Sequence, residues 1–309
     1  MESKCKLLLQ RIAAGNPFQK QYIARIEKKE TLHVDQTLLS CLIDFWNSKG
    51  MPVQTMADAY LEFVLDAIVE QIYFKKYHQY KNRKYSDICS ANYGNSQYME
   101  KYLAALEISD CLWENHLEIR SWYSRRLQKV AACKQFVEIG CGGGLNLIPA
   151  FDRFREMHYI AVDVSEKAIE VCRDFFSWAC DKEIIKSGTL EAVCTDVFEW
   201  TNQTVPDVLS MFEVLEHVPN PQQLLQRIFE IAGQDTVLFV STVINSPMPD
   251  HIYLFRSQDE VKSMVTAAGF DIIDCCCAPA NGLSLEQAEK SENPITMALE
   301  LRRKNNDVL

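Results

Sequence analysis

The sequence lacks the features of a membrane-embedded or secreted protein. No apolar run approaches the ~20 residues that a membrane-spanning helix needs. The first ten residues carry one short apolar stretch and no small-residue cleavage pattern, so we expect neither a signal peptide nor a membrane partner. Internal repeats and low-complexity segments are also absent. A soluble, cytoplasmic protein of one or two domains is therefore expected from these 309 residues.

Paired metal-binding cysteines are absent too. Twelve cysteines are present, but no two of them form a Cys-x-x-Cys pair. The nearest grouping is the run Cys275 to Cys277, and adjacent residues on a strand point to opposite faces, which makes a poor metal clamp. We interpret the thiols as free, buried and small hydrophobic groups in a reducing compartment.

Positive charge is scarce in the second part of the chain. The net charge is −10, and residues 1–130 contain 18 Lys and Arg against 15 Asp and Glu, whereas residues 131–309 contain 14 against 27. This acidity argues against a broad phosphate-binding surface, so nucleic acid is a disfavoured partner. One basic cluster has two interpretations, a solvated helix end or a site that attracts an anionic substrate. Its members are Lys75, Lys76, Lys81, Arg83 and Lys84.

The chain changes its periodicity near residue 130. Before that point apolar residues recur at helical spacing within 38–46, 56–72 and 99–112. A polar, aromatic stretch from Tyr80 to Tyr98 is predicted to be a loop because of its turn residues. We expect residues 1–130 to form a helical cap that serves as a substrate domain, and residues 131–309 to form a second, cofactor-binding domain.

After residue 134 short apolar runs alternate with helical patterns, which predicts a parallel sheet with helices on both faces. The predicted strands are 135–139, 159–162, 190–194, 208–212 and 237–240. The predicted helices are 145–155, 167–178, 222–231 and 257–268. The C-terminal part of the chain departs from this alternation. Its predicted strands 271–277 and 295–301 are joined by a polar loop, 281–294, without a helix, which suggests a final antiparallel pair.

The first predicted strand runs into a glycine-rich loop. Four of the eleven glycines lie within residues 140–144, and a strand, a glycine loop and a helix together bring backbone to a nucleotide-like ligand. The loop departs from the dinucleotide fingerprint G-x-G-x-x-G, because Leu145 holds the sixth position. Glu138 stands two residues before the first glycine, where an acid suits a cationic ligand and repels a diphosphate.

Acidic residues follow the next strands at the same edge of the predicted sheet. Asp163 ends the second strand, 23 residues after Gly140, where a carboxylate accepts hydrogen bonds from ribose hydroxyls. Asp196 follows the third strand, where it can accept from an adenine amino group. Ligands of open α/β sheets bind at this edge. The fourth strand leads into Phe212, Glu213, Glu216 and His217.

These motifs together resemble the class I S-adenosylmethionine (SAM)-dependent methyltransferases, in order and spacing, across residues 134–301. The segment 250–255 and the helix after it resemble the small-molecule branch that includes ubiquinone-type O-methyltransferases. The resemblance implies a Rossmann-like α/β fold with a seven-stranded sheet whose last strand is antiparallel. It implies SAM as the cofactor, at Glu138, Gly140, Gly142, Gly144, Asp163, Val164, Asp196, Val197 and Phe212.

The segment after the fourth strand supplies the catalytic candidates. We expect His217, supported by Glu213, to accept a proton or orient the substrate, because imidazole titrates near neutral pH. Glu213, Glu216 and His217 are spaced i, i+3 and i+4, so one helix face could carry all three. With His251 they would suit a divalent metal. Small-RNA 3′-end 2′-O-methyltransferases hold magnesium with a similar Glu-x-x-Glu-His arrangement, yet methyltransferases without metal share it, and we expect no metal here.

Aromatic residues of the helical part are candidates for the substrate pocket. Tyr93 and His116 belong to the group around the polar stretch. An aromatic lid would exclude water and face a sulfonium by cation–π contact, although aromatic residues at helical spacing are often plain core. The residues expected to contact a small-molecule acceptor are Tyr98, Tyr102, Trp113 and His251.

The predicted function is SAM-dependent methyl transfer to a small molecule, with oxygen, nitrogen and carbon acceptors all open. Two alternatives from other classes remain: an RNA-modifying, metal-dependent methyltransferase, and a non-catalytic SAM-binding module. An NAD-linked oxidoreductase ranks below these, because Leu145 breaks its fingerprint. A homodimer through the helical domain is a further expectation.

Overall fold

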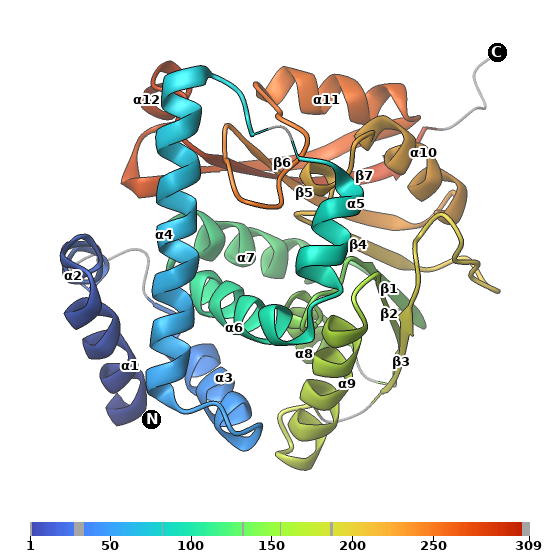
Figure 1. The fold of residues 1–309 in the computed structure, drawn as a ribbon. Coiled ribbons are helices and arrows are strands. Elements are labelled where there is room, and N and C mark those ends of the chain that lie inside the picture. Colours follow the sequence, from blue (N-terminus) through green and yellow to red (C-terminus); the bar gives the residue numbers. More distant parts are fainter. Residues whose placement is uncertain are drawn as a thin grey trace.

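The computed structural model describes residues 2–27, 34–81, 83–131, 133–154, 156–185 and 188–304. Helices make up the N-terminal part, and a sheet with further helices follows (Figure 1). None of the helices in the described ranges is long and apolar enough to cross a lipid bilayer. The N-terminal helices are α1 (Glu2–Gly15), α2 (Pro17–Ile26), α3 (Gln36–Ser48), α4 (Val53–Tyr77), α5 (Tyr85–Ile88), α6 (Ser96–Leu112) and α7 (Glu114–Leu127).

The helices predicted from apolar spacing in the first part of the sequence are confirmed, although one of them leaves part of its apolar pattern exposed. Helix α3 begins where the Asp35 side chain accepts a hydrogen bond from the backbone N–H of Leu38 at 2.9 Å, and it buries its whole apolar face. Helix α4 buries Met56, Tyr60, Phe63 and Val64 but leaves Ile68 and Ile72 exposed, at 36% and 65%. Ile68 and Ile72 therefore keep the helical spacing without facing the core.

The predicted loop from Tyr80 to Tyr98 is largely helical. Helix α5 passes directly into a π-helical turn, Cys89–Tyr93, and α6 begins only three residues later. Gly94 ends the π turn, and the Asn95 side chain caps α6 by accepting from the backbone N–H of Tyr98 at 3.1 Å. The turn residues Gly94 and Asn95 therefore separate two helical segments. The loop prediction is wrong for most of this stretch, because residues that end and cap helices also favour turns.

The seven predicted strands form one sheet in the order β3-β2-β1-β4-β5-β7-β6. Strands β1 to β5 are parallel, and β7 is antiparallel to both β5 and β6, which confirms the implied seven-stranded fold. The strands are β1 (Gln135–Ile139), β2 (His158–Asp163), β3 (Thr189–Cys194), β4 (Val208–Phe212), β5 (Val237–Ile244), β6 (Phe270–Pro279) and β7 (Ile295–Arg303).

Helices cover both faces of this sheet, as the alternation predicted. Successive strand residues point to opposite faces. Phe136 packs in a core with α7, α8 and α9, whereas Val137 packs in a core with α10 and α11. Arg155, the expected end of the first helix after the glycine loop, lies outside the described residues. The helices are α8 (Ile148–Arg153), α9 (Glu166–Asp181), α10 (Pro221–Ile231) and α11 (Gln258–Ala267).

The predicted polar loop 281–294 contains a short helix, α12 (Leu285–Lys290). Ser284 and Gln287 form a capping box in which each side chain accepts from the other's backbone N–H, at 3.2 and 2.9 Å. The loop prediction is wrong at α12, although the Ser-x-x-Gln pattern was visible in the sequence. The two strands are still antiparallel, because a helix this short lets the chain reverse at one end of the sheet.

All twelve cysteines are free thiols, as expected, but only four of them are buried. The buried four are Cys5, Cys111, Cys141 and Cys172, while Cys194 and Cys275 are exposed. The expectation of buried thiols is therefore wrong for most of the set.

The helical part packs directly on the glycine loop and α9. Leu103 of α6 shares one core with Leu145 and with Phe175 of α9, and the rings of Phe45 and Phe175 meet edge to face at 5.2 Å. Helix α7, which precedes residue 130, covers one face of the sheet beside β6 and β7 (Figure 1). This packing fixes the helical part over the carboxyl ends of the strands.

Candidate functional site

A cavity of about 820 Å³ lies between the helical part and the carboxyl ends of β1 to β4. Helices α2, α4, α6 and α7 form one wall, and the loops after the strands form the other. Three predicted site residues, Glu138, Gly144 and Tyr98, do not line this cavity. The other predicted residues do: Gly140, Gly142, Asp163, Val164, Asp196, Val197, Phe212, Glu213, His217, Tyr102, Trp113 and His251.

The glycine loop exposes its backbone to the cavity. Gly140 and Gly142 have positive φ angles of 68° and 51°, a conformation that other residues rarely adopt. A Cβ on Gly140 would lie 2.4 Å from Val214, whereas one on Gly142 would meet only Leu103, at 3.6 Å. Gly140 therefore permits close packing against the segment after β4, and Gly142 leaves room for a ligand beside the loop.

The Asp163 carboxylate is held by the backbone at the end of β2. Its oxygens accept from the N–H groups of Gly142 at 2.9 Å and Ser165 at 2.8 Å. Burial raises the pKa of Asp163. Asp196, after β3, accepts from the N–H of Phe198 at 2.9 Å. Each carboxylate is thus fixed in orientation and retains lone pairs that can accept hydroxyl or amino groups of a ligand.

Glu138 and Gly144 support the loop from behind. Glu138 is fully buried in β1, and within the described residues neither of its carboxylate oxygens has a hydrogen-bond partner. Burial raises its pKa well above the ordinary value. A Cβ on Gly144 would lie 2.8 Å from the Cys172 sulfur, so this glycine allows the loop to pack against α9. Since Glu138 is buried behind the loop and does not line the cavity, it can act on a ligand only through the loop.

His217 lines the cavity and is held through one ring nitrogen. Its Nδ1 lies 3.0 Å from the Tyr93 hydroxyl, 3.2 Å from the Asp250 carbonyl oxygen and 3.5 Å from the Asp250 carboxylate. Burial lowers the pKa of His217, but the Asp250 and Glu216 carboxylates outweigh it and leave the pKa raised. With Nδ1 engaged, Nε2 is the nitrogen that can exchange a proton with a ligand.

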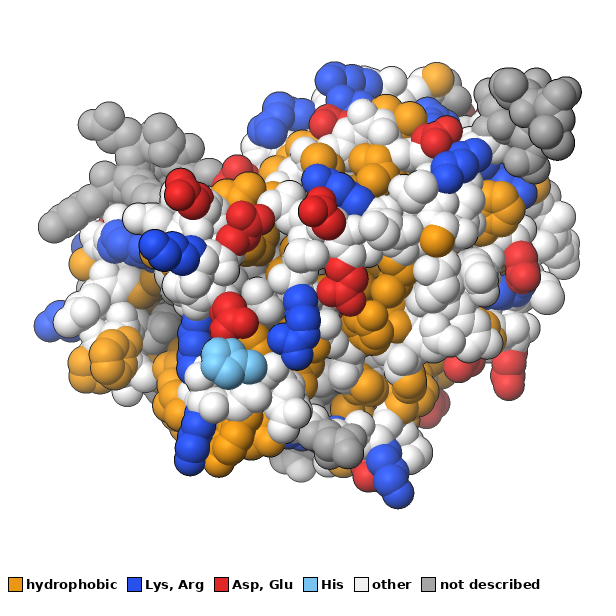
Figure 2. All heavy atoms as spheres, turned by 90° about the horizontal axis from the view of Figure 1, so that it is seen from above, with side chains coloured by type: hydrophobic (Ala, Val, Ile, Leu, Met, Phe, Trp, Pro, Cys, Tyr) orange, Lys and Arg blue, Asp and Glu red, His pale blue; other side chains and the backbone are white. Residues whose placement is uncertain are grey.

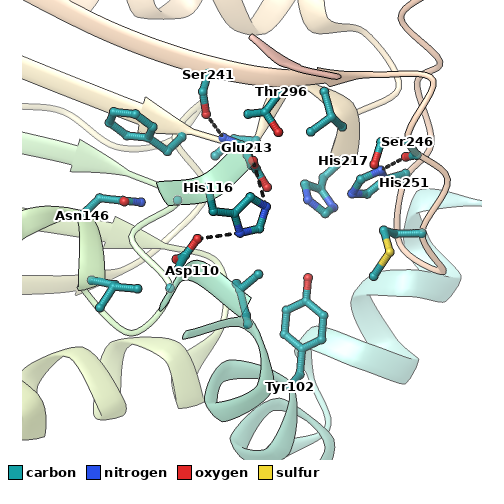
Figure 3. A pocket seen from close by; sticks show the side chains of 18 of the residues that line it. Tyr102, Asp110, His116, Asn146, Glu213, His217, Ser241, Ser246, His251 and Thr296 are labelled. Carbon is teal, nitrogen blue, oxygen red and sulfur yellow. Dashed lines mark hydrogen bonds and ion pairs between the residues drawn. The ribbon is translucent and has the colours of Figure 1, made fainter. Parts of the chain in front are cut away.

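The predicted single helix face for Glu213, Glu216 and His217 is wrong. The helix is one short turn, Leu215–His217, and Glu213 precedes it in a left-handed conformation with a φ of 52°. Its N–H donates to the Ser241 carbonyl and hydroxyl oxygens, both at 3.1 Å, which turns its carboxylate toward His116 (Figure 3). The carboxylate beside His217 is that of Asp250, whose role the sequence did not reveal.

The cavity holds a second imidazole, that of His116. The sequence indicated this residue only as one of the group around the polar stretch. His116 of α7 has its Nδ1 2.9 Å from Asp110 and its Nε2 3.9 Å from Glu213 (Figure 3). Burial lowers the pKa of His116, but Glu213 and Asp110 outweigh it and leave the pKa raised. Because Glu213 lies far along the chain on another element, no sequence pattern could have joined these residues.

Three residues beside the cavity could hold a divalent metal, and two of them, His217 and His251, line it. Ligand atoms of Glu216, His217 and His251 lie within 4.8 Å of one another. Glu216 is fully buried and accepts from Thr242 at 2.8 Å through one oxygen, while its other oxygen has no partner in the described part of the chain. His251 donates Nδ1–H to the Ser246 carbonyl at 2.6 Å, and burial lowers its pKa to about 4. A neutral imidazole with a free Nε2 is a suitable ligand.

Two of the predicted aromatic residues, Tyr102 and Trp113, line the wall that the helical part forms. The Tyr102 hydroxyl donates to the Asp250 carboxylate at 3.0 Å, and Tyr98 stacks on the outer side of Tyr102 at 5.8 Å. Trp113 stacks on Phe63 at 5.6 Å between ring centroids. The acceptor side of the cavity is therefore mostly apolar, with polar groups converging from Asp110, His116, Glu213 and His217.

Glu107 is a buried acid that joins the helical part to the glycine loop. It accepts from the Trp46 indole N–H at 2.7 Å, and a Cβ on Gly143 would lie 2.1 Å from its other oxygen. Burial raises the pKa of Glu107 to about 8. The folded chain therefore keeps a proton at pH 7 that the unfolded chain releases, which lowers stability between the two pKa values.

We expect Glu107→Gln to raise the free energy of unfolding at pH 7 by about 2 kcal/mol, because glutamine keeps the hydrogen bond to Trp46 without the protonation penalty. Denaturant unfolding followed by fluorescence measures this difference. The stability difference between the variant and the unmodified chain should shrink toward zero near pH 4, where Glu107 is protonated in both the folded and the unfolded state. A variant less stable than the native chain at pH 7 would show that Glu107 is ionised.

The basic cluster is not part of this cavity. Lys81 and Arg83 pair with the buried Glu70 of α4 at 2.8 and 2.5 Å, and Lys75 donates to the backbone carbonyls of residues 291 and 292. Figure 2 shows acidic and basic side chains interspersed on the face that includes this end of α4. These contacts favour the interpretation of the basic cluster as a helix end over a site that attracts an anionic substrate.

A family model for methyltransferase domains matches residues 113–274, from α7 to β6. That match covers more than half of the chain. The chain belongs to this methyltransferase family. Its relatives include ubiquinone biosynthesis O-methyltransferases from Nitrosomonas europaea, 26% identical over 37% of this chain and 46% of the relative, and from Cupriavidus pinatubonensis, 24% identical over 56% and 74%. The chain thus spans about half the length of the first of these curated relatives.

A solved structure shares the fold of the methyltransferase and its helical part. Mitomycin 7-O-methyltransferase superimposes with a TM-score of 0.52 over 85% of this chain and 73% of that chain, at 12% identity. An identity this low shows the fold alone.

Proposed function

We propose that this methyltransferase transfers the methyl group of SAM to a small molecule bound in the 820 Å³ cavity. One observation carries the proposal. A single cavity joins the glycine loop, Asp163 and Asp196 on one side to an apolar wall with two acid-flanked imidazoles on the other. A cofactor and an acceptor can therefore meet inside one water-poor space.

The cofactor side of the cavity fits SAM, which supplies an electrophilic methyl group on a sulfonium when bound. Asp163 would accept from the ribose hydroxyls and Asp196 from the adenine amino group. The open backbone beside Gly142 leaves room for the amino-acid part. The apolar contacts would come from Val164, Val197 and Phe212, and Glu138 would act through the loop.

On the acceptor side the chain has to orient the nucleophile and remove its proton. His217 is the proposed proton acceptor at Nε2, with Asp250 and Tyr93 fixing Nδ1. Glu213 and His116 lie at the end of β4 and would orient the acceptor. Tyr102, Trp113 and His251 would contact its body, with Tyr98 supporting Tyr102.

We further propose that residues 1–130 serve as the substrate domain and residues 131–309 as the SAM domain of a cytoplasmic enzyme with no nucleic-acid partner. The apolar acceptor wall and the mixed charge of Figure 2 support a small-molecule substrate. Incubation with methyl-labelled SAM and an extract of the native host, followed by mass spectrometry, would identify the acceptor. Label only in RNA would favour the nucleic-acid alternative, and SAM binding without any labelled product would favour a non-catalytic module.

A metal-dependent version is the second candidate, supported by the three ligand atoms of Glu216, His217 and His251. We expect methyl transfer to persist in excess EDTA, because Asp250 and Tyr93 engage Nδ1 of His217 and the proposed reaction needs its Nε2 as the proton acceptor, which leaves neither nitrogen for a metal ion. The rate is measured before and after chelation with an identified acceptor. Loss of activity that Mg²⁺ restores would assign the three residues to a metal and would contradict His217 as the proton acceptor.

A further inference from the structure

Helix α4 carries an apolar stripe that no described part of the chain covers. Leu65, Ile68, Val69 and Ile72 are 56%, 36%, 47% and 65% exposed. Their spacing, i, i+3, i+4 and i+7, places all four on one face of this 25-residue helix. Soluble monomers rarely expose large apolar side chains contiguously, and such a patch marks an interaction surface.

Charges flank this apolar stripe with opposite signs at its two ends. Asp58 lies seven residues before Leu65, and Lys76 lies seven residues after Val69, so both stand on the same face, close to two turns away. Both side chains are exposed. This face of α4 is thus acidic before the apolar stripe and basic after it.

We infer that the apolar stripe of α4 binds the same stripe of a second copy of this chain, with the two helices antiparallel. A two-fold axis at the middle of the stripe, between Ile68 and Val69, places Leu65 opposite Ile72 of the second copy, and Asp58 within one helical turn of its Lys76. A parallel pair would instead place acid beside acid and base beside base. The pattern is therefore complementary to itself in one orientation only.

The pairing would also cover part of the acceptor cavity. Ile68 belongs to the stripe and lines the cavity, together with its neighbours Ala67 and Gln71. The cavity therefore reaches the surface beside the stripe, and a second copy seated there would close it at this side. This inference stands on the exposed face of α4 and does not depend on the proposed reaction.

Sedimentation velocity of the full chain over a range of concentrations tests the pairing. We expect a reversible dimer whose dissociation constant rises about 100-fold or more in Ile72→Asp, because the substitution occurs twice in a symmetric interface. Ile273→Asp is the matched control, since Ile273 is 51% exposed but lies on β6. It should leave the dimer intact. Dissociation by Ile273→Asp instead of Ile72→Asp would overturn the inference in favour of the sheet edge.

A charge exchange tests the antiparallel orientation without removing apolar surface. Asp58→Lys and Lys76→Asp should each weaken the dimer, and the double variant should restore it, because both partners are then exchanged. Failure of the double variant to restore the dimer would contradict the pairing of Asp58 with Lys76. A native chain that is monomeric at every concentration, or whose α4 is protected from hydrogen exchange only by added phosphatidylcholine vesicles, would overturn the inference.

Discussion

Replacing His217 with alanine is expected to lower the rate of methyl transfer by ~10²–10⁴ while leaving SAM affinity within a few-fold. The substitution removes the Nε2 proposed as the proton acceptor and leaves the glycine loop, Asp163 and Asp196 in place. Single-turnover rates with an identified acceptor, together with calorimetric SAM titrations, measure both quantities. His158→Ala is the control, because His158 begins β2 at the opposite edge of the sheet.

The pH dependence adds an independent check on this role. A proton acceptor must be neutral before the reaction, and the neighbouring carboxylates leave the pKa of His217 raised. The rate should therefore fall as the pH drops through this raised pKa, and Asp250→Asn should shift the fall to lower pH. A near-normal rate in His217→Ala, with loss of rate in His116→Ala, would assign the proton transfer to His116 and Glu213 instead.

Replacing Asp163 with alanine is expected to weaken SAM binding by about 1.5–3 kcal/mol, the size of the charge-assisted hydrogen bonds that its carboxylate would form with a ribose. Calorimetry measures the affinity directly. Asp207→Ala is the matched control, because Asp207 also accepts from two backbone N–H groups, of Lys134 at 2.7 Å and Gln135 at 3.0 Å, but at the opposite edge of the sheet.

The control separates loss of a ligand contact from loss of structure. Both substitutions remove two hydrogen bonds to backbone, so both should lower stability by a similar amount. Only Asp163→Ala should lower SAM affinity. Equal weakening by the two variants would show that the effect comes from the fold and that Asp163 does not contact the cofactor.

Local patterns in the sequence predicted the sheet and the cofactor edge well. Buried strands are visible in a sequence as short apolar runs. Residues that follow parallel strands lie at the same end of the sheet, because all of those strands run in one direction. Asp163, Asp196 and the glycine loop therefore came together as expected around one cavity. The helix at 285–290 was missed, although its capping box was present, because polar residues were interpreted as a loop.

The acceptor side could not be predicted to the same extent, because its contacts join distant segments. Asp250 reaches His217, and His116 reaches Glu213, through the packing of the helical part on the strand ends. The left-handed backbone at Glu213 also breaks the i, i+3, i+4 spacing that suggested one helix face. Side-chain partners of this kind depend on tertiary structure, which residue spacing does not specify.

Titration calorimetry of the full chain with S-adenosylhomocysteine, the demethylated product of SAM, and with NAD tests the central proposal most directly. The glycine loop, the acids at the ends of β2 and β3 and the cavity beside them predict micromolar binding of the product and of SAM, and no binding of NAD. Binding of NAD, with no heat from either SAM or its product, would contradict the proposed cofactor and with it the proposed methyl transfer.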